Sequence, residues 1–126
     1  GILGGHKCLI TKVIFDVGIK DNVQICHYAP DVCKLNKCLS VWLKQGIELY
    51  GLFHTHFFNV SSLSQGDIAY IKQILLGMPE EKKWLYFPIV VLPDKKMVSY
   101  RCSLDGDKLV VQDESISIVN CAENII

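Results

Sequence analysis

An apolar run of strand length, residues 47–55, lies between two segments in which apolar residues recur every three or four positions. The run carries hydrophobic side chains on both sides, which is typical of a strand buried within a sheet. The spacing in the flanking segments is that of helices with one apolar face. The sequence therefore predicts an α/β fold with a mixed central sheet and flanking helices.

The two helical segments have recognisable ends. The first begins after Pro30 and ends at Gly46, and glycine is common just beyond the last turn of a helix. The second closes near Gly77 and Pro79. The predicted apolar faces consist of Val32, Leu35, Leu39, Trp42 and Leu43 in the first helix, and of Ile68, Ile71, Ile74, Leu75 and Leu76 in the second.

The other strands are predicted from short runs rich in β-branched and aromatic residues. These runs are 8–15, with 22–27 as a hairpin partner, 84–92, 97–103 and 108–119. Asp105-Gly106 between the last two runs is a strong signal for a tight hairpin turn. No repeat or linker interrupts the sequence, so we expect a single domain covering residues 1–126.

Charge and hydropathy argue against some classes of partner. The chain has 13 basic and 13 acidic side chains, so it offers no excess positive charge to a nucleic acid or an anionic membrane. Its longest apolar stretches, such as 87–92, are far shorter than the roughly 20 residues that span a bilayer. The first residues do not resemble a signal peptide, which predicts a cytoplasmic location. Because the chain does not begin with Met, we expect its natural N-terminus to lie upstream.

Six cysteines occur at positions 8, 26, 33, 38, 102 and 121, and no two of them form a C-x-x-C pair. Cys33 and Cys38 are five positions apart on the first predicted helix. Their side chains therefore point about 140° apart and cannot bind one ion together. We expect free, buried and reduced thiols and no thiolate metal site.

The segment with the clearest chemistry is His54-Thr55-His56, followed by Ser64 and Asp67. Residues two apart in a strand point to the same face, so the two imidazoles can reach one metal ion. Ser64 marks the start of the second helix, and Asp67 lies in its first turn. The intervening loop is long enough to bring the carboxylate back over the end of the strand as a third ligand.

Two histidines and one carboxylate leave the fourth tetrahedral position of a zinc ion for water, as in catalytic zinc sites. Such an ion lowers the pKa of its water toward about 7 and polarises a carbonyl group. Ser64 lies on the same helical face as Asp67, and we expect its hydroxyl to stabilise a developing oxyanion. The constellation lacks a general base.

Each part of this pattern also has an ordinary structural explanation. Ser64-x-x-Asp67 is a common helix start, and alternate histidines can simply face solvent. The combination at one spacing is what favours a metal site. His6 and His27 are isolated and weaker candidates. The aromatic residues around the histidines, Tyr50, Phe53, Phe57 and Phe58, are interpreted as packing in the core or shielding the site, with substrate binding as the alternative.

The segment Gly51-Leu-Phe-His54-Thr-His56, followed by Leu63-Ser64-Gln-Gly-Asp67, resembles the JAMM signature of the JAB/MPN+ metalloproteases, which is H-x-H followed by S-x-x-D at this spacing. The glycine-rich opening and the run 87–92 are also similar to segments of the short prokaryotic members. The resemblance covers about the first hundred residues, and the neutral chain lacks the long insertions of eukaryotic relatives.

This resemblance implies an α/β fold similar to that of cytidine deaminases and one zinc ion per chain. It implies hydrolysis of isopeptide or peptide bonds, commonly at the C-terminal tail of ubiquitin or a ubiquitin-like protein. It carries over His54, His56 and Asp67 as zinc ligands and Ser64 as the residue that stabilises the oxyanion.

Two positions depart from the family pattern. The family's general base is a Glu just before the glycine-rich opening, whereas the first Glu here is Glu48, roughly 20 Å along the strand from His54. We therefore expect the base to lie upstream of Gly1. Phe57 stands where the family usually has Pro.

Two alternatives to the enzyme remain open. The first is a catalytically incomplete JAB/MPN domain that serves as a protein-interaction scaffold. The second is a RadC-like relative, which shares the spacing of the motif. The neutral charge and the missing Pro-Ser-Gly after the second His count against this second alternative.

Overall fold

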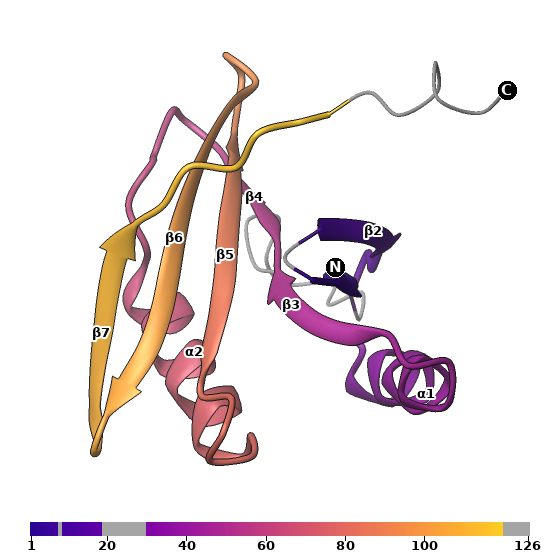
Figure 1. Ribbon diagram of the computed structural model, residues 1–126. Coiled ribbons are helices and arrows are strands. Elements are labelled where there is room, and N and C mark those ends of the chain that lie inside the picture. The colour runs from indigo at the N-terminus through magenta and orange to yellow at the C-terminus, as the bar shows by residue number, and fades with distance from the viewer. Residues whose placement is uncertain (8, 19–29, 120–126) are drawn as a thin grey trace, which may run out of the picture.

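The computed structural model describes residues 1–7, 9–18 and 30–119 (Figure 1). In these ranges the chain forms seven strands and two helices, which confirms the predicted mixed sheet with flanking helices. In chain order they are β1 (Ile2–His6), β2 (Leu9–Ile14), α1 (Val32–Lys44), β3 (Glu48–Leu52), β4 (His54–His56), α2 (Gln65–Leu76), β5 (Trp84–Val91), β6 (Lys96–Asp105) and β7 (Lys108–Asp113).

The strands form one mixed sheet in the order β2-β1-β3-β5-β6-β7, and β4 pairs with β5 beyond the end of β3. β3 and β4 both run parallel to β5, whereas the other neighbours are antiparallel. β3 lies between β1 and β5, so the predicted central position of the run 47–55 is confirmed. Phe53 separates this run into two strands, and the histidines occupy the second one.

The N-terminal region differs from the prediction of one strand over 8–15. The glycine-rich opening is itself a strand, β1, and it forms an antiparallel pair with β2. Glycine is needed here because a Cβ at Gly5 would collide with the carbonyl of Leu9, and a Cβ at Gly4 would lie within 2.5 Å of the Trp42 ring. Close approach of neighbouring groups therefore outweighs the low strand propensity of glycine. The expected hairpin partner at 22–27 lies outside the described residues.

Both predicted helices are confirmed to within a few residues. Asp31 caps α1 by accepting a hydrogen bond from the backbone N–H of Lys34 at 3.2 Å, and Gly46 follows the helix with a φ of +71°. Leu35 and Trp42 are buried, but Leu43 is 81% exposed. Leu43 points about 90° away from the mean direction of the two buried residues, so its assignment to the apolar face was wrong.

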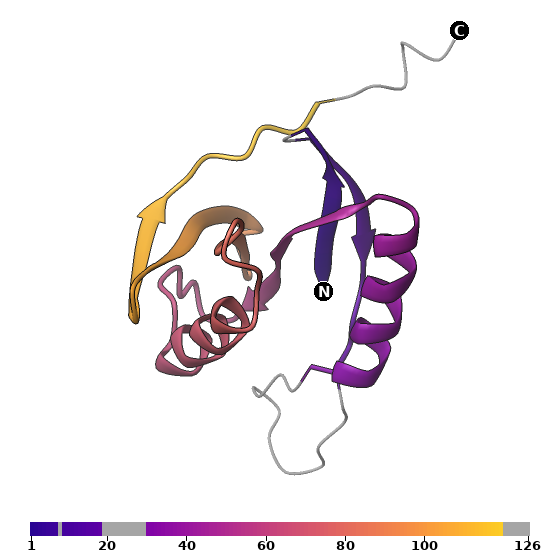
Figure 2. The same ribbon diagram turned by 60° about the horizontal axis from the view of Figure 1, so that its bottom comes forward.

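The core lies between α2 and the sheet. Alternate residues of β5 are buried on the face that α2 covers, and Ile71 and Leu75 of α2 are fully buried against them. Figures 1 and 2 show α2 inside the curve of β5 and β6, and α1 beside β3 and β1. The buried cluster comprises Ile2, Leu35, Trp42, Leu52, Ile71, Leu75, Leu85, Phe87, Ile89, Val91 and Cys102.

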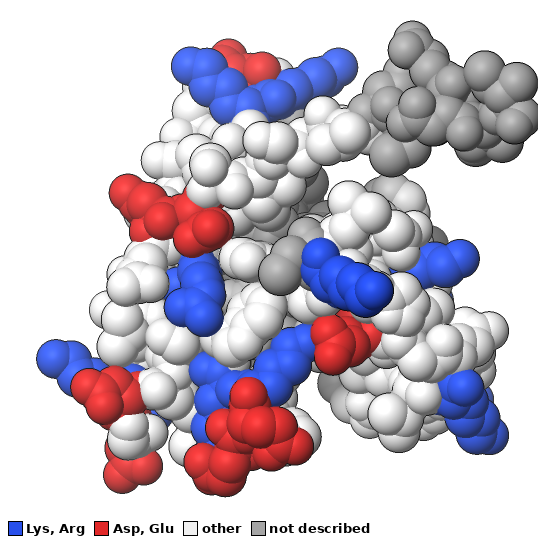
Figure 3. Space-filling view, viewed as in Figure 1, with Lys and Arg blue, Asp and Glu red and all other residues white. Residues whose placement is uncertain are grey.

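Strand β7 ends at Asp113 and is therefore shorter than the predicted strand over 108–119. The two-residue turn at Gly106 is confirmed, with Asp105 paired to Lys108 and a φ of +61° at the glycine. Basic and acidic side chains are interspersed on the face shown in Figure 3. Neither helix of the described residues is long and apolar enough to cross a membrane.

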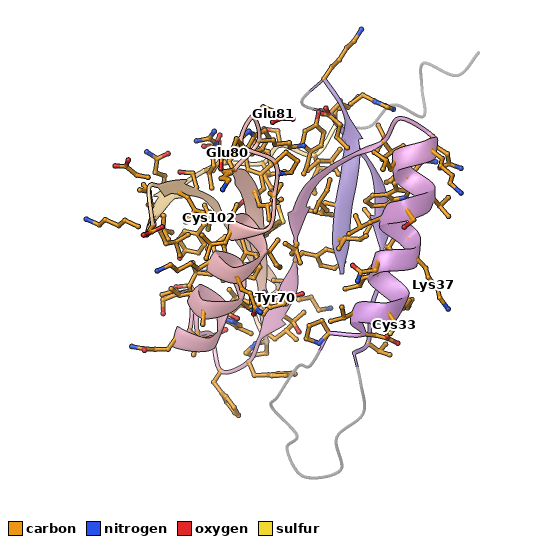
Figure 4. The ribbon with its side chains drawn as sticks, turned by 90° about the horizontal axis from the view of Figure 1, so that it is seen from below. Cys33, Lys37, Tyr70, Glu80, Glu81 and Cys102 are labelled. Carbon is orange, nitrogen blue, oxygen red and sulfur yellow. The ribbon has the colours of Figure 1, made fainter. Side chains whose placement is uncertain are left out.

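Three cysteines lie in the described residues, and all three are free thiols. Cys102 is buried in the core and Cys38 is half-buried, whereas Cys33 is exposed on α1 (Figure 4). The expectation of free thiols is confirmed for these positions, but the expectation of burial was wrong for Cys33, which lies outside the buried face of the helix. Cys8, Cys26 and Cys121 are outside the described residues.

Candidate metal site

The two histidines lie at the carboxyl end of the central strand pair. β4 continues the line of β3 and pairs with β5 in a register that places His54 beside Ile89 and His56 beside Val91. Because His54 and His56 are two residues apart, both rings project to the face of the sheet that α2 covers. Their ring centroids are 4.5 Å apart.

The carboxylate of Asp67 is positioned by the start of α2. Ser64 is the N-cap, and its hydroxyl oxygen accepts a hydrogen bond from the backbone N–H of Asp67 at 3.0 Å. In return, Oδ2 of Asp67 accepts from the backbone N–H of Ser64 at 2.9 Å. This reciprocal pair is a capping box, so the predicted helix start is confirmed.

Strand and helix bring the three predicted ligands together. The Nε2 atoms of His54 and His56 lie 3.2 Å and 3.0 Å from the Asp67 carboxylate oxygens and 2.7 Å from each other. Each side chain is less than one fifth exposed. Their ligand atoms all lie within 4.8 Å of one another, so the group could bind a metal ion.

The hydrogen-bonding pattern of His56 brings its Nε2 atom close to another hydrogen-bond acceptor. Nδ1 of His56 lies 3.2 Å from the carbonyl oxygen of Val60. A carbonyl can only accept, so Nδ1 carries the proton, and a neutral His56 has a lone pair at Nε2. That lone pair faces Oδ2 of Asp67 at 3.0 Å. Two acceptors at this distance require either a further proton or a metal ion between them.

His54 is held in a different way. Its ring packs against the ring of Phe87, with centroids 4.9 Å apart. Its Nδ1 atom is buried and has no hydrogen-bond partner among the described residues. The polar contacts of His54 within this part of the chain are made by Nε2, with His56 and Asp67.

Asp67 remains ionised in this environment. Partial burial alone would raise the pKa of its carboxyl. The hydrogen bonds from His54 and from the backbone of Ser64, together with the charge of His54, outweigh this effect and hold the pKa well below its usual range. The third candidate ligand is thus a carboxylate at neutral pH, as coordination requires.

The distances between the candidate ligand atoms can be compared with those expected around a tetrahedral metal ion. Ligand atoms about 2.0–2.1 Å from a zinc ion are about 3.3 Å apart in a tetrahedron. The distances of 3.2 Å from His54 to Oδ1 of Asp67 and of 3.0 Å from His56 to Oδ2 are near this value, although they end on different oxygens of the carboxylate. The two Nε2 atoms, 2.7 Å apart, would have to separate by about 0.6 Å to reach it.

The three side chains line a cavity of about 700 Å³. Ser64 also lines it, and its hydroxyl keeps a proton to donate because the contact with Asp67 uses only an oxygen lone pair. Tyr70 of α2, labelled in Figure 4, lines the cavity as well. Burial, and then the charge of Asp16, raise the pKa of Tyr70. Sequence reasoning missed Tyr70, although its position three residues after Asp67 places it on the same helical face.

The remaining candidates lie elsewhere or have structural roles. Glu48 is at the opposite end of β3, beside Gly5, with Lys82 3.9 Å away. His6 is exposed at the end of β1, and His27 is outside the described residues. Tyr50 is buried and stacks on Trp84, as expected for a core residue.

The other aromatic residues near the histidines line the cavity. They are Phe53, Phe57 and Phe58. Phe57 and Phe58 are exposed, so they are not part of the core.

Comparison of the chain with models of known protein families gives no match, and comparison with curated protein sequences gives none either.

Proposed function

We propose that this chain is a zinc-dependent hydrolase of the JAB/MPN+ type that cleaves isopeptide or peptide bonds, with the C-terminal tail of a ubiquitin-like protein as substrate. The observation that carries the proposal is the convergence of two Nε2 atoms and an ionised carboxylate at the wall of a cavity that Ser64 also lines. The resemblance of His54-x-His56 and Ser64-x-x-Asp67 to the JAMM signature supplies the substrate class.

His54, His56 and Asp67 would hold the zinc ion, which when bound supplies a Lewis acid and a water molecule with a pKa near 7. The Val60 carbonyl keeps the proton of His56 on Nδ1, so that Nε2 is free to coordinate. The capping box fixes the direction of the Asp67 carboxylate. Ser64 would donate a hydrogen bond from its hydroxyl group to the oxyanion that forms on the substrate carbonyl.

The described residues of the cavity do not supply a general base beside the candidate ligands. Asp67 is the only carboxylate among the described residues that line the cavity, and its role as a ligand excludes it as a base. Gly1 lines the same cavity, and its amine donates a hydrogen bond to the carbonyl of Phe53, the residue before His54. A Glu shortly before Gly1 would therefore lie within a few residues' reach of the site. We propose that the full-length protein supplies its base there.

The test uses the full-length protein loaded with zinc, together with fusions in which a ubiquitin-like protein is joined to a reporter. We expect cleavage after the ubiquitin-like tail, and loss of that cleavage in the His56→Ala variant. His6→Ala is the matched control, because His6 is exposed and outside the cavity. Zinc binding without cleavage of any fusion or peptide would contradict the proposal.

The second candidate function is a protein-interaction scaffold. It is favoured by one observation, the lack of a second carboxylate among the described residues of the cavity. The two candidates differ in the sequence that precedes Gly1. An acidic residue close to Gly1 in the full-length protein favours the enzyme, and a segment without one favours the scaffold.

A further inference from the structure

We propose that Phe57, Phe58 and Val60, here called the aromatic rim, bind a large apolar side chain of the substrate polypeptide next to the scissile bond. This inference rests on the proposed function and adds a specificity to it. The three residues line the same cavity as the candidate ligands. They follow His56 almost directly in the chain.

The aromatic rim exposes an unusual amount of apolar surface. Phe58 is 83% exposed, Phe57 is 48% exposed and Val60 is 46% exposed. The two phenyl rings lie 6.5 Å apart, within the range in which aromatic rings interact. Contiguous exposed apolar groups at the wall of a cavity are typical of a binding surface.

The backbone beneath the aromatic rim is held in a conformation that phenylalanine rarely adopts. Phe58 and Asn59 have φ values of +59° and +56°, in the left-handed region. Asn59 donates a hydrogen bond from its N–H to the carbonyl of Leu92 at 2.7 Å. These contacts with the end of β5 maintain a strained turn, and strain of this kind is concentrated at functional sites.

The aromatic rim is also connected to the ligands. Phe57 directly follows His56, and the Val60 carbonyl accepts the hydrogen bond from Nδ1 of His56. Adjacent residues of an extended polypeptide are about 3.3–3.6 Å apart along the chain. A substrate whose scissile carbonyl lies at the candidate ligands therefore has a neighbouring side chain within reach of the aromatic rim.

The charges of the cavity favour an apolar occupant. Among the described residues that line it, Asp67 has the only acidic side chain, and none is Lys or Arg. No Lys or Arg of the described lining would pair with an acidic substrate side chain, and a basic one would compete with the metal ion for Asp67. Contact between the phenyl rings and another apolar group is instead favourable, because it removes apolar surface from water.

The test measures cleavage and binding separately. Peptides of one sequence carry Ala, Leu, Phe or Asp at a single position beside the scissile bond, in one series on each side of it. For one of these two positions, we expect the zinc-loaded full-length protein to cleave the Phe and Leu peptides with kcat/KM roughly tenfold or more above the Ala peptide. We expect the Asp peptide to be the poorest.

The variant is Phe58→Asn, because Asn tolerates a positive φ and the turn is preserved. We expect it to keep its zinc content while its preference for the Phe peptide over the Ala peptide falls severalfold. Leu43→Asn is the control, since Leu43 is similarly exposed but lies on α1 away from the cavity. It should retain the preference for Phe.

Fluorescence anisotropy with labelled peptides distinguishes the two proposals. One outcome is that no peptide is cleaved, the Phe peptide binds more tightly than the Ala peptide, and Phe58→Asn removes this difference in binding. The aromatic rim then binds apolar groups, and the proposed hydrolase activity is wrong. Equal cleavage of the Ala and Phe peptides in both series would overturn the inference while the hydrolase stands. Equal binding without cleavage would overturn both. The inference about the aromatic rim would also be overturned if the protein dimerises with increasing concentration and Phe58→Asn abolishes this dimerisation. A second copy of the chain would then cover the aromatic rim.

Discussion

Nδ1 of His56 donates a hydrogen bond to the carbonyl oxygen of Val60, 3.2 Å away. This contact determines which nitrogen of the ring is available to the Asp67 carboxylate and to a metal ion. It also ties the ring to the loop that carries the aromatic rim. One backbone carbonyl thus links the candidate metal ligands to the surface proposed to recognise the substrate.

The first prediction concerns metal content. We expect about one zinc ion per chain in the purified protein and little in the His56→Ala variant, because removing one of three ligands leaves too few to hold the ion. Elemental analysis measures the ratio of metal to protein. Zinc should also raise the melting temperature of the parent, since a ligand that binds only the folded state stabilises it. Folded parent protein that contains no metal and whose melting temperature does not change with zinc would contradict this prediction.

The second prediction separates the two roles of Ser64. Ser64→Ala removes the N-cap of α2 and should lower the free energy of unfolding by about 1 kcal/mol. In the zinc-loaded full-length enzyme it should lower kcat by about 10²–10³ through loss of the oxyanion donor. Ser64→Asp can still cap the helix but has no hydroxyl proton to donate. A Ser64→Asp variant with normal kcat would show that the hydroxyl has only a structural role.

The third prediction concerns Gly51, which pairs with Tyr86 where β3 and β5 run side by side. A Cβ at this position would collide with the carbonyl of Tyr86, which is main chain and cannot rotate away. Gly51→Ala should therefore cost about 1–3 kcal/mol, measured by chemical denaturation. Gly66→Ala is the matched control, because its Cβ would meet only the Ser64 hydroxyl at 3.8 Å. It should be neutral or stabilising by about 1 kcal/mol, since Ala favours helices more than Gly does.

The fourth prediction concerns thiol chemistry. Burial raises the pKa of the Cys102 thiol to about 11, whereas Cys33 is exposed on α1. Iodoacetamide at pH 8 should modify Cys33 quickly and leave Cys102 unmodified until the protein is unfolded, because the thiolate is the reactive form. Mass spectrometry of the alkylated peptides measures both rates. Rapid modification of Cys102 in folded protein would contradict the burial of this residue.

The same shift predicts a dependence of stability on pH. The folded state binds the Cys102 proton more tightly than the unfolded state, whose thiol has a pKa near 9. The contribution of this thiol to stability is therefore complete below about pH 9, and is lost as the pH rises from about 9 towards 11. Cys102→Ala should reduce this loss in a denaturation series over that range.

Local patterns in the sequence were sufficient to predict both helices and the central strand. Each depends on apolar spacing or on an end signal such as Gly46 or Ser64, and tertiary packing agrees with those signals here. The proximity of His54 and His56 follows from the alternation of side chains along a strand. The capping box then brings Asp67 to them.

Other features depend on contacts between distant residues and left no local signal. In strand β1, Gly4 lies against the ring of Trp42 and Gly5 lies against the backbone of Leu9, so neither position has room for a side chain. The break at Phe53 cannot be read from an uninterrupted apolar run. The exposure of Phe57 and Phe58 depends on a turn with positive φ that the carbonyl of Leu92 holds in place.

One oxygen, Oδ2 of Asp67, belongs both to the cap of α2 and to the group of candidate ligands. A metal ion coordinated by this oxygen would therefore change the electrostatic environment of the first helical turn. Local order in that turn and metal occupancy are thermodynamically coupled. Amide hydrogen exchange at the start of α2 would then vary with the supply of the ion, and would report metal binding by this domain even when no substrate is present.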